Sequence, residues 1–355
     1  MSNRAPTDRT PLILVSGHTF GLRAFEGIFA SRAYLERRVD VALMIGLDDS
    51  HAGATVGYQS LEPLACEQGV PHISTSDGRL TSLAGQIRDA GPAYILIIGW
   101  SRLVPAEILA IPAAVAAGAL SPASAAAAGV PSTAGLPSTA GVPSTADAAQ
   151  SAAGAAYSAA GEFGCIGMHP TRLPEGRGQA PIPWTIIKGC QKTALSVFFL
   201  EPGADSGPII AQYDLDVHPR ETASSLFYRV ANAHFTAGLE LAEDLGKRHV
   251  SSRVQDPATA TRWPKRRPAD GEIRDTMTCR EIDSLVRALM GPYPRAFVMA
   301  GGRKLDILAT QFVPASAENS AGHADLANGR VRYRCADGTI DLFPVSSLSA
   351  APGAQ

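Results

Sequence analysis

Two residues of this chain have the side chains and surroundings that proton transfer requires. His169 lies just past an apolar strand, in a loop that Pro170 and Pro174 make rigid, and Asp205 lies in the glycine-containing loop 203–207. An imidazole titrates near neutral pH and can shuttle a proton, while a nearby carboxylate orients it and stabilises its charged form. Acyl transfer to an amine needs such a pair, so we predict catalytic roles for both residues. The alternatives are a histidine that caps a turn and an aspartate that closes an Asx turn.

The first third of the chain alternates between short apolar runs and helical patterns. Strands are expected at residues 12–15, 39–45, 70–73 and 94–98, and helices at 22–31, 60–68, 80–90 and 105–110. This alternation predicts an α/β fold with a doubly wound, mostly parallel sheet. A further strand at 164–168 leads into His169. Because such sheets bind ligands at the carboxyl ends of their strands, we expect loop 99–104, the His169 loop and the Asp205 loop to converge.

The remaining segments predict a second, smaller domain. A helix at 184–188, strands at 195–199 and 209–214 and a long amphipathic helix at 223–245 complete the first domain. Beyond them we expect a helix at 278–289 and short strands at 297–300, 306–310, 330–335 and 340–343, which is typical of a small β-rich domain. The predicted divisions are a tail at 1–10, a catalytic domain at 11–250, a Pro- and Arg-rich linker at 251–270, a C-terminal domain at 271–345 and a tail at 346–355.

A low-complexity segment at 113–161 interrupts the first domain. It contains three tandem copies of Gly-Val/Leu-Pro-Ser-Thr-Ala at 129–146. Each copy has one modest apolar residue, which cannot offset the entropy lost on ordering the chain. We therefore predict a disordered insertion, with a rigid spacer or recognition segment as the alternative.

Composition and charge exclude several classes of protein. The 355 residues carry a formal net charge of -2, so bulk charge does not indicate a polyanion-binding protein. No apolar run nears membrane-spanning length, and the N-terminus lacks a signal-peptide core. The five cysteines are scattered and show no metal-ligand spacing, which indicates reduced thiols in a cytoplasm. We expect a cytoplasmic protein with no metal and no membrane partner.

Two blocks of sequence together resemble a known family. Residues 167–184 read Gly-Met-His-Pro-Thr-Arg-Leu-Pro-Glu-Gly-Arg-Gly-Gln-Ala-Pro-Ile-Pro-Trp, and residues 201–209 read Glu-Pro-Gly-Ala-Asp-Ser-Gly-Pro-Ile. In this order they resemble the active-site blocks of the 10-formyltetrahydrofolate-dependent formyltransferases, which include methionyl-tRNA formyltransferase and the sugar N-formyltransferases. Residues 263–268 and 285–289 are similar to the hinge and C-terminal domain of these enzymes. The resemblance covers residues 11–112 and 162–345.

The resemblance implies a Rossmann-like transferase of one-carbon metabolism, with 10-formyltetrahydrofolate as formyl-donor co-substrate. His169 would be the proton shuttle and Asp205 would orient it. By position, the folate would contact Arg102, Leu103, Val104, Thr171, Leu173, Pro174, Glu201, Pro202, Gly203, Ala204 and Asp205. Core packing is the alternative role for Leu103 and Val104.

The chain departs from the family pattern two positions before the histidine. Gly167 stands where the family has an Asn that helps to hold the formyl oxygen as it gains negative charge. Loss of one such donor typically lowers the rate by about 10²–10³-fold. The hypothesis is that activity persists with a backbone N–H, a water, Gln179 or Thr171 as donor. The alternative is a folate-binding homologue with weakened catalysis.

The acceptor amine is less well defined by the sequence. In tRNA-acting relatives the segment after the second strand carries a basic insertion, whereas residues 47–59 contain Asp48 and Asp49 and no Lys or Arg. Against this stands a basic cluster that would suit phosphates, formed by Lys247, Arg248, Arg253, Arg262, Lys265, Arg266 and Arg267. A solvated linker face is the alternative interpretation of that cluster. We predict a biosynthetic enzyme acting on a small-molecule amine, such as an amino sugar nucleotide or a hydroxyornithine-like compound, with tRNA as the alternative and the oligomeric state open.

Overall fold

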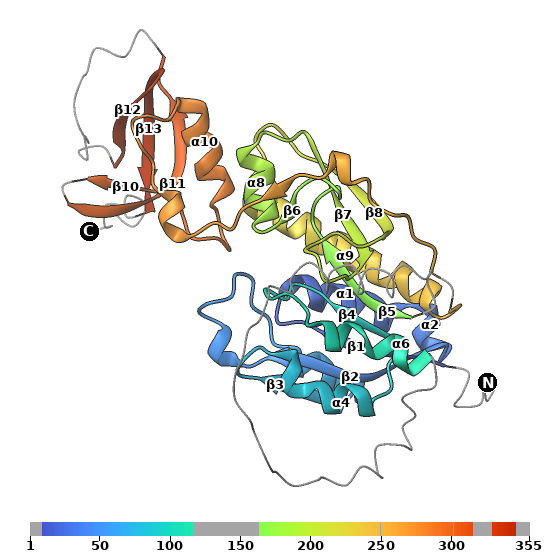
Figure 1. Cartoon of the computed structure of the whole chain (residues 1–355). Helices are drawn as coiled ribbons and strands as arrows, with labels where there is room; N and C mark the ends of the chain where they lie inside the picture. Colours follow the sequence, from blue (N-terminus) through green and yellow to red (C-terminus); the bar gives the residue numbers. More distant parts are fainter. Residues whose placement is uncertain (1–8, 117–162, 249, 301, 315–328, 346–355) are drawn as a thin grey trace, which may run out of the picture. The chain divides into compact units, whose positions relative to one another are not determined.

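The structure is a computed structural model that describes residues 9–116, 163–248, 250–300, 302–314 and 329–345 (Figure 1). Residues 1–8 of the predicted tail 1–10, the predicted tail 346–355 and residues 117–161 of the predicted insertion 113–161 lie outside this part of the chain. The chain divides into two compact units. The first comprises Met1–His169, Ser196–Tyr213 and Ala231–Thr259, and the second comprises Pro170–Leu195, Asp214–Val230 and Ala260–Gln355. The predicted domain limits at 250 and 270 stay predictions.

A seven-stranded sheet forms the centre of the first unit. Its strands stand in the order β3-β2-β1-β4-β5-β7-β8. Their bounds are β1 Thr10–Val15, β2 Val39–Leu47, β3 His72–Thr75, β4 Tyr94–Ile97, β5 Gly164–His169, β7 Lys192–Phe199 and β8 Ile209–Asp216. The first five strands pair in parallel, and β7 runs antiparallel to β5. This confirms the predicted doubly wound, mostly parallel sheet. The chain order reverses between β1 and β4, which is where such sheets bind ligands.

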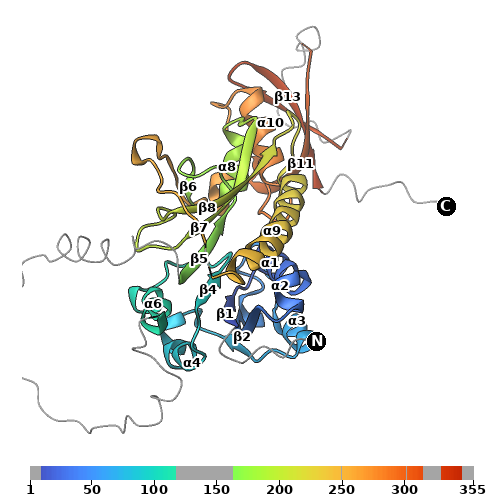
Figure 2. The same ribbon diagram turned by 90° about the vertical axis from the view of Figure 1, so that its right-hand side faces the viewer.

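Helices cover both faces of this sheet (Figure 2). On one face, η3 Leu80–Leu83, α4 Ala84–Asp89, α5 Ala106–Leu109 and α6 Ile111–Ala116 pack on the apolar side chains of β1, β2 and β4. On the other face lie α1 Thr19–Ala30, α2 Arg32–Leu35 and α3 Glu62–Gln68. Strand side chains alternate between the two faces, so these buried strands are apolar on both sides.

A close helix contact holds α1 against the second half of α9 Ala223–Leu245. A Cβ on Gly27 would lie 2.1 Å from the Phe235 carbonyl oxygen, and one on Gly238 would lie 2.0 Å from that of Ala24. Only glycine permits this backbone-to-backbone approach.

The second unit contains an antiparallel sheet of four strands in the order β10-β11-β13-β12. Their bounds are β10 Phe297–Ala300, β11 Arg303–Phe312, β12 Val331–Cys335 and β13 Gly338–Pro344. Helix α10 Cys279–Ala288 buries Ile282, Leu285 and Val286 in the same apolar core as these strands, and a capping box between Thr278 and Glu281 starts the helix. This confirms the predicted β-rich C-terminal domain.

Short elements complete both units. In the second unit these are α8 Pro181–Ile187, β6 Arg177–Gly178, its partner β9 Arg262–Trp263, and η5 Pro268–Gly271. The first unit adds η2 Asp49–His51 and η4 Pro257–Thr259.

Several predicted boundaries were wrong because local polar contacts and prolines set them. Helix α1 begins at Thr19 rather than at residue 22, because the His18 side chain accepts a hydrogen bond from the Phe20 N–H. Helix α8 begins at Pro181 rather than at 184, since proline is well tolerated in a first turn, where the N–H groups have no acceptor. The predicted helix 80–90 starts as the 3-10 turn η3. His169 is the last residue of β5, not the residue beyond it.

The prediction of reduced thiols was wrong for two of the five cysteines. Cys279 and Cys335 form a disulfide across a sequence separation of 56, with their Cα atoms 5.9 Å apart. The fold brings the start of α10 to the end of β12, a contact that sequence spacing does not reveal. Cys66, Cys165 and Cys190 are free, being exposed, buried and half-buried respectively. None of the helices in the described part of the chain is long and apolar enough to cross a membrane.

Candidate active site

The structure brings His169 and Asp205 together. Their Nδ1 and Oδ2 atoms are 3.9 Å apart, and their side chains are 9% and 20% exposed. This separation suits an ion pair and is longer than a hydrogen bond. Catalytic hydrogen bonds are often long until substrate binds. The pair is therefore placed for proton transfer with a carboxylate beside the imidazole.

A tight loop holds Asp205 in this position. The loop leaves β7 at Leu200, whose N–H donates to the Cys165 carbonyl at 2.8 Å, and it closes with the Phe199 N–H donating to the Pro208 carbonyl at 2.9 Å. Asp205 adopts a left-handed conformation with φ 55°, which Asp tolerates better than most residues. A Cβ on Gly207 would lie 1.9 Å from the Phe199 carbonyl oxygen. Between these fixed ends the aspartate has little freedom to move.

The side chain of Leu200 lies close to position 167. A Cβ there would lie 2.7 Å from Leu200 Cδ2 and 3.4 Å from Phe198 Cε1. Any side chain larger than hydrogen at position 167 would therefore require Leu200 to shift.

The loop after β1 places a neutral histidine at the ligand-binding edge of the sheet. Burial lowers the pKa of His18 from 6.5 to about 4. The Nδ1 atom of His18 accepts from the Phe20 N–H at 3.0 Å, so the ring proton of the neutral form is on Nε2. Gly99, two residues beyond the end of β4, has φ 66° and approaches the His18 ring. The sequence analysis gave His18 no role, although a side chain that caps a helix is a recognisable signal.

The predicted folate-contacting residues of loop 99–104 divide into two groups. Arg102 and Leu103 line a cavity of about 180 Å³, and Leu103 is 69% exposed. The other lining residues are Gly78, Arg79, Leu80, Thr81, Trp100 and Pro105. Val104 instead packs against the apolar core of the sheet, which is the alternative role considered for it.

The other predicted residues lie in two turns. Glu201, Pro202, Gly203 and Ala204 belong to the Asp205 loop of the first unit, whereas Thr171, Leu173 and Pro174 form a turn in the second. Thr171 and Leu173 are buried, and the Thr171 hydroxyl donates to the Glu175 carbonyl at 2.8 Å. Because that hydroxyl has a single hydrogen, Thr171 is a poor candidate for the donor that Gly167 lacks.

The second unit has a larger cavity of its own, of about 950 Å³. The buried carboxylate of Asp283 lies in its wall and accepts hydrogen bonds from Arg220, Arg287 and Thr310. None of the predicted site residues lines this cavity.

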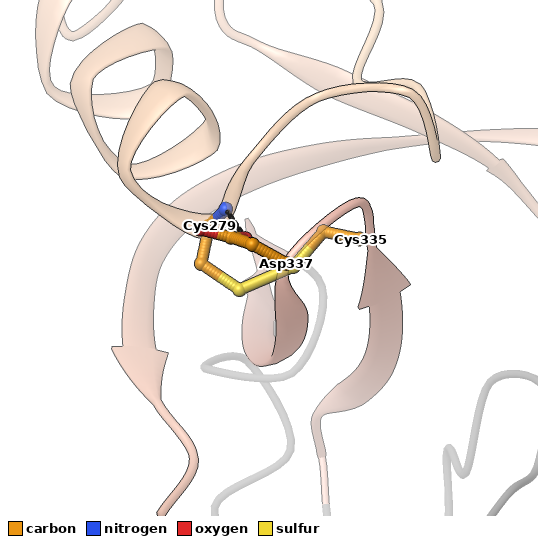
Figure 3. A group of neighbouring side chains, drawn as sticks. All are labelled: Cys279, Cys335 and Asp337. Atoms are coloured by element: carbon orange, nitrogen blue, oxygen red, sulfur yellow. Dashed lines mark hydrogen bonds between the residues drawn. A yellow bond between two sulfur atoms is a disulfide. The ribbon is translucent and has the colours of Figure 1, made fainter.

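One group of side chains among the described residues has converging metal-ligand atoms. Cys279, Cys335 and Asp337 offer atoms within 4.8 Å of one another (Figure 3). The two sulfur atoms are bonded to each other, and Asp337 Oδ1 accepts from the Cys279 N–H at 2.7 Å. A disulfide offers no thiolate ligand, so in this state the group is a cross-link rather than a metal centre.

Comparison with known proteins gives family matches in two segments of the chain. A family model described as formyl transferase matches residues 156–240, and one described as formyl transferase, C-terminal domain, matches residues 265–346. Both matched segments are thus similar to parts of formyltransferases. A curated relative, methionyl-tRNA formyltransferase of Desulfotalea psychrophila, is 34% identical over 177 residues, which are 50% of this chain and 52% of the relative. The chain thus matches about half the length of that formyltransferase.

Solved structures of formyltransferases share the fold at low identity. An N-formyltransferase from Helicobacter canadensis, in complex with folinic acid and dTDP-3-aminofucose, superposes with a TM-score of 0.58 at 12% identity, over 95% of this chain and 99% of that one. Methionyl-tRNA formyltransferase from Clostridium thermocellum gives 0.52 at 20% identity, over 86% and 94%. At these identities the likeness concerns the fold alone.

Proposed function

We propose that this protein is an N-formyltransferase that moves a formyl group from 10-formyltetrahydrofolate to the amine of a small molecule. The observation that carries the proposal is the approach of His169 and Asp205 within 3.9 Å, at the end of β5, in a chain that matches two formyltransferase models. Both side chains are largely buried, which strengthens the electrostatic interaction between them.

The reaction requires a proton to travel between two nitrogens. The amine nitrogen forms a bond to the formyl carbon, and the bond between that carbon and the folate nitrogen breaks. The amine gives up one proton and the folate nitrogen takes one up. His169 carries this proton, and Asp205 orients the imidazole and stabilises its charged form.

The cavity of loop 99–104 supports a folate donor. Trp100 and Arg102 in its wall offer an aromatic face and a planar cation with several N–H donors, which suit a flat heterocycle with polar edges. Among the neighbours in fold, a sugar 3N-formyl transferase was crystallised with 5-N-formyl-THF and HypX from Aquifex aeolicus with tetrahydrofolic acid. We assign the donor-binding role to Arg102 and Leu103, together with Glu201–Asp205 of the same unit.

The loop after β2 favours a small amine over tRNA. Residues 48–59 form a compact acidic loop, in which Asp48 caps η2 and the Tyr58 hydroxyl donates to Asp49 at 2.9 Å. Several members of the basic cluster are engaged internally. Lys247 pairs with Asp244, Arg248 donates to the Arg9 carbonyl, and Arg266 lies over the Trp184 ring. These contacts compete with phosphate binding at three of the seven cations, so we propose an amino sugar nucleotide or a hydroxyornithine-like acceptor.

The second candidate is tRNA, which the 34% identity to a methionyl-tRNA formyltransferase favours. The two acceptors differ in how binding responds to salt. Affinity for tRNA falls steeply with ionic strength because phosphate contacts release counterions, whereas affinity for a small amine changes much less.

A mass-spectrometric screen tests the proposed function. The full chain is incubated with 10-formyltetrahydrofolate and with amino sugar nucleotides, hydroxyornithine or charged initiator tRNA, and formylated product is measured. We expect product with a small amine, and a loss of about 10²–10⁴-fold in kcat for His169→Ala. His218→Ala, a histidine of the second unit outside the proposed site, is the control. Folate binding by calorimetry without product from any acceptor would instead indicate a binding protein.

A further inference from the structure

A buried glutamine outside every recognised block supports the loop that carries Asp205. Gln255 lies in the segment after α9 and is only 4% exposed. Its side-chain amide donates one hydrogen bond to the Asp205 carbonyl at 2.9 Å and another to the Gly207 carbonyl at 2.7 Å. Both amide hydrogens are therefore directed at the backbone on either side of Ser206.

The segment that carries Gln255 is itself anchored to the sheet. Ile209 and Arg253 exchange backbone hydrogen bonds of 2.8 Å in both directions, so the segment runs beside the start of β8. The Arg253 guanidinium also donates to the Gln212 side chain, and Gln212 donates to the Ser196 hydroxyl at 2.8 Å. Ser196 pairs with His169 between β7 and β5. Gln255 and the two proposed catalytic groups thus share one framework within the first unit.

We propose that Gln255 is a positioning residue for formyl transfer, which fixes the backbone of Asp205 and thereby the carboxylate beside His169. This inference rests on the proposed function. The Asp205 backbone is in the left-handed region, which few non-glycine residues adopt without support. The two hydrogen bonds supply that support, since they tie the backbone on both sides of Ser206 to the Gln255 side chain.

The chemistry of the contact requires an amide of this length. A glutamate has the same shape but only acceptor oxygens when ionised, so it would repel both carbonyls. An asparagine keeps the donors but is shorter by one methylene and cannot span the same distance. Gln255→Glu and Gln255→Asn therefore test the donors and their reach separately, and Gln86→Glu, on the exposed face of α4, is the matched control.

The experiment compares these variants with the wild type in the formylation assay, after thermal denaturation has shown that each is folded. We expect kcat to fall about 10- to 100-fold for Gln255→Glu, because a small misplacement of a catalytic group is costly. The KM values for donor and amine should change little, since Gln255 is buried and acts through the Asp205 backbone. A loss of kcat at unchanged KM, in variants as well folded as the wild type, distinguishes a positioning role from a purely structural one.

A double variant tests whether Gln255 acts through Asp205. In Asp205→Asn, which lacks the carboxylate charge, Gln255→Glu should cause little further loss, because both changes impair the same function. If Gln255→Glu does not fold, Gln255→Asn carries the test.

The outcomes separate the two proposals. A wild type that formylates none of the amines overturns the proposed function and this inference with it. An active wild type with folded Gln255 variants of unchanged kcat overturns the inference alone. Equal losses in the wild-type and Asp205→Asn backgrounds would also reject it.

Discussion

The packing around Gly167 leads to a prediction that does not depend on the reaction. A methyl group at this position would lie 2.7 Å from Leu200 Cδ2 and 3.3 Å from Leu200 Cγ, closer than carbon atoms pack. Gly167 has no positive φ, so its backbone conformation suits alanine. Any cost of Gly167→Ala therefore comes from the collision with Leu200 rather than from backbone strain.

The expected magnitude follows from overpacking of a buried site. Inserting one methyl group into a well-packed core costs about 1–3 kcal/mol. Leu200 is partly buried and its side chain can rotate, which favours the lower half of that range. For a domain of this size each 1 kcal/mol corresponds to a fall in Tm of about 2–4 °C. In the Leu200→Ala background the collision is removed, and Gly167→Ala should become neutral or stabilising.

The assay is a double-mutant cycle in thermal or urea denaturation. We expect a coupling energy of at least about 1 kcal/mol between positions 167 and 200. Gly85→Ala is the control, because a Cβ there meets nothing within 4 Å and alanine stabilises a helix by up to about 1 kcal/mol. If Gly167→Ala is as benign as Gly85→Ala, or costs the same in both Leu200 backgrounds, Leu200 does not close this space.

Three further predictions concern pH, thiols and a buried carboxylate. Burial lowers the pKa of His18 from 6.5 to about 4, so between these pH values the unfolded state binds more protons than the folded state. The contribution of His18 to the free energy of unfolding should therefore be fully present above pH 6.5 and decrease as the pH falls towards 4, by at most about 3 kcal/mol. His18→Asn keeps a capping side chain and should flatten this slope in denaturation curves measured across that range. Iodoacetamide should modify exposed Cys66 rapidly and leave Cys165 unmodified in the folded protein, since burial raises the pKa of the Cys165 thiol; peptide mapping that finds both modified at equal rates would contradict this. Asp283→Asn should destabilise the protein by about 3 kcal/mol, because it removes the charge that Arg287 faces in a buried site, and unchanged calorimetric unfolding of the second unit would refute that expectation.

Apolar periodicity was sufficient to predict most of the fold. Buried strands such as β4 are continuous apolar runs, and α9 has the predicted limits of 223 and 245, because both patterns follow directly from which side chains are buried. The helix ends that were predicted wrongly depend on single side chains. The His18 cap and the prolines of α8 set where those helices begin, and a pattern averaged over a window does not register either contact.

In the candidate site, some residues could be recognised from the sequence, and others could be recognised only from the contacts that the fold creates. The residue types and loop context of His169 and Asp205 were visible in the sequence, and the fold brings the two together. Gln255 had no such signal, because a glutamine in a linker is ordinary until its two acceptors, some 50 positions away, are known. The Cys279–Cys335 bond was hidden for the same reason.

The departure from the family pattern at Gly167 involves a second position, Leu200. Leu200 fills the space beside Gly167, so replacing the glycine with Asn would require Leu200 to move. A water molecule in the space beside Gly167 therefore cannot replace the missing hydrogen-bond donor, because a site closed by apolar atoms does not hold water. Thr171 already donates to the Glu175 carbonyl. The remaining candidates for the donor are a backbone N–H, the Gln179 side chain and a water placed elsewhere. In the Leu200→Ala background an Asn at position 167 has room, so its effect on the formylation rate can be compared with that of these donors.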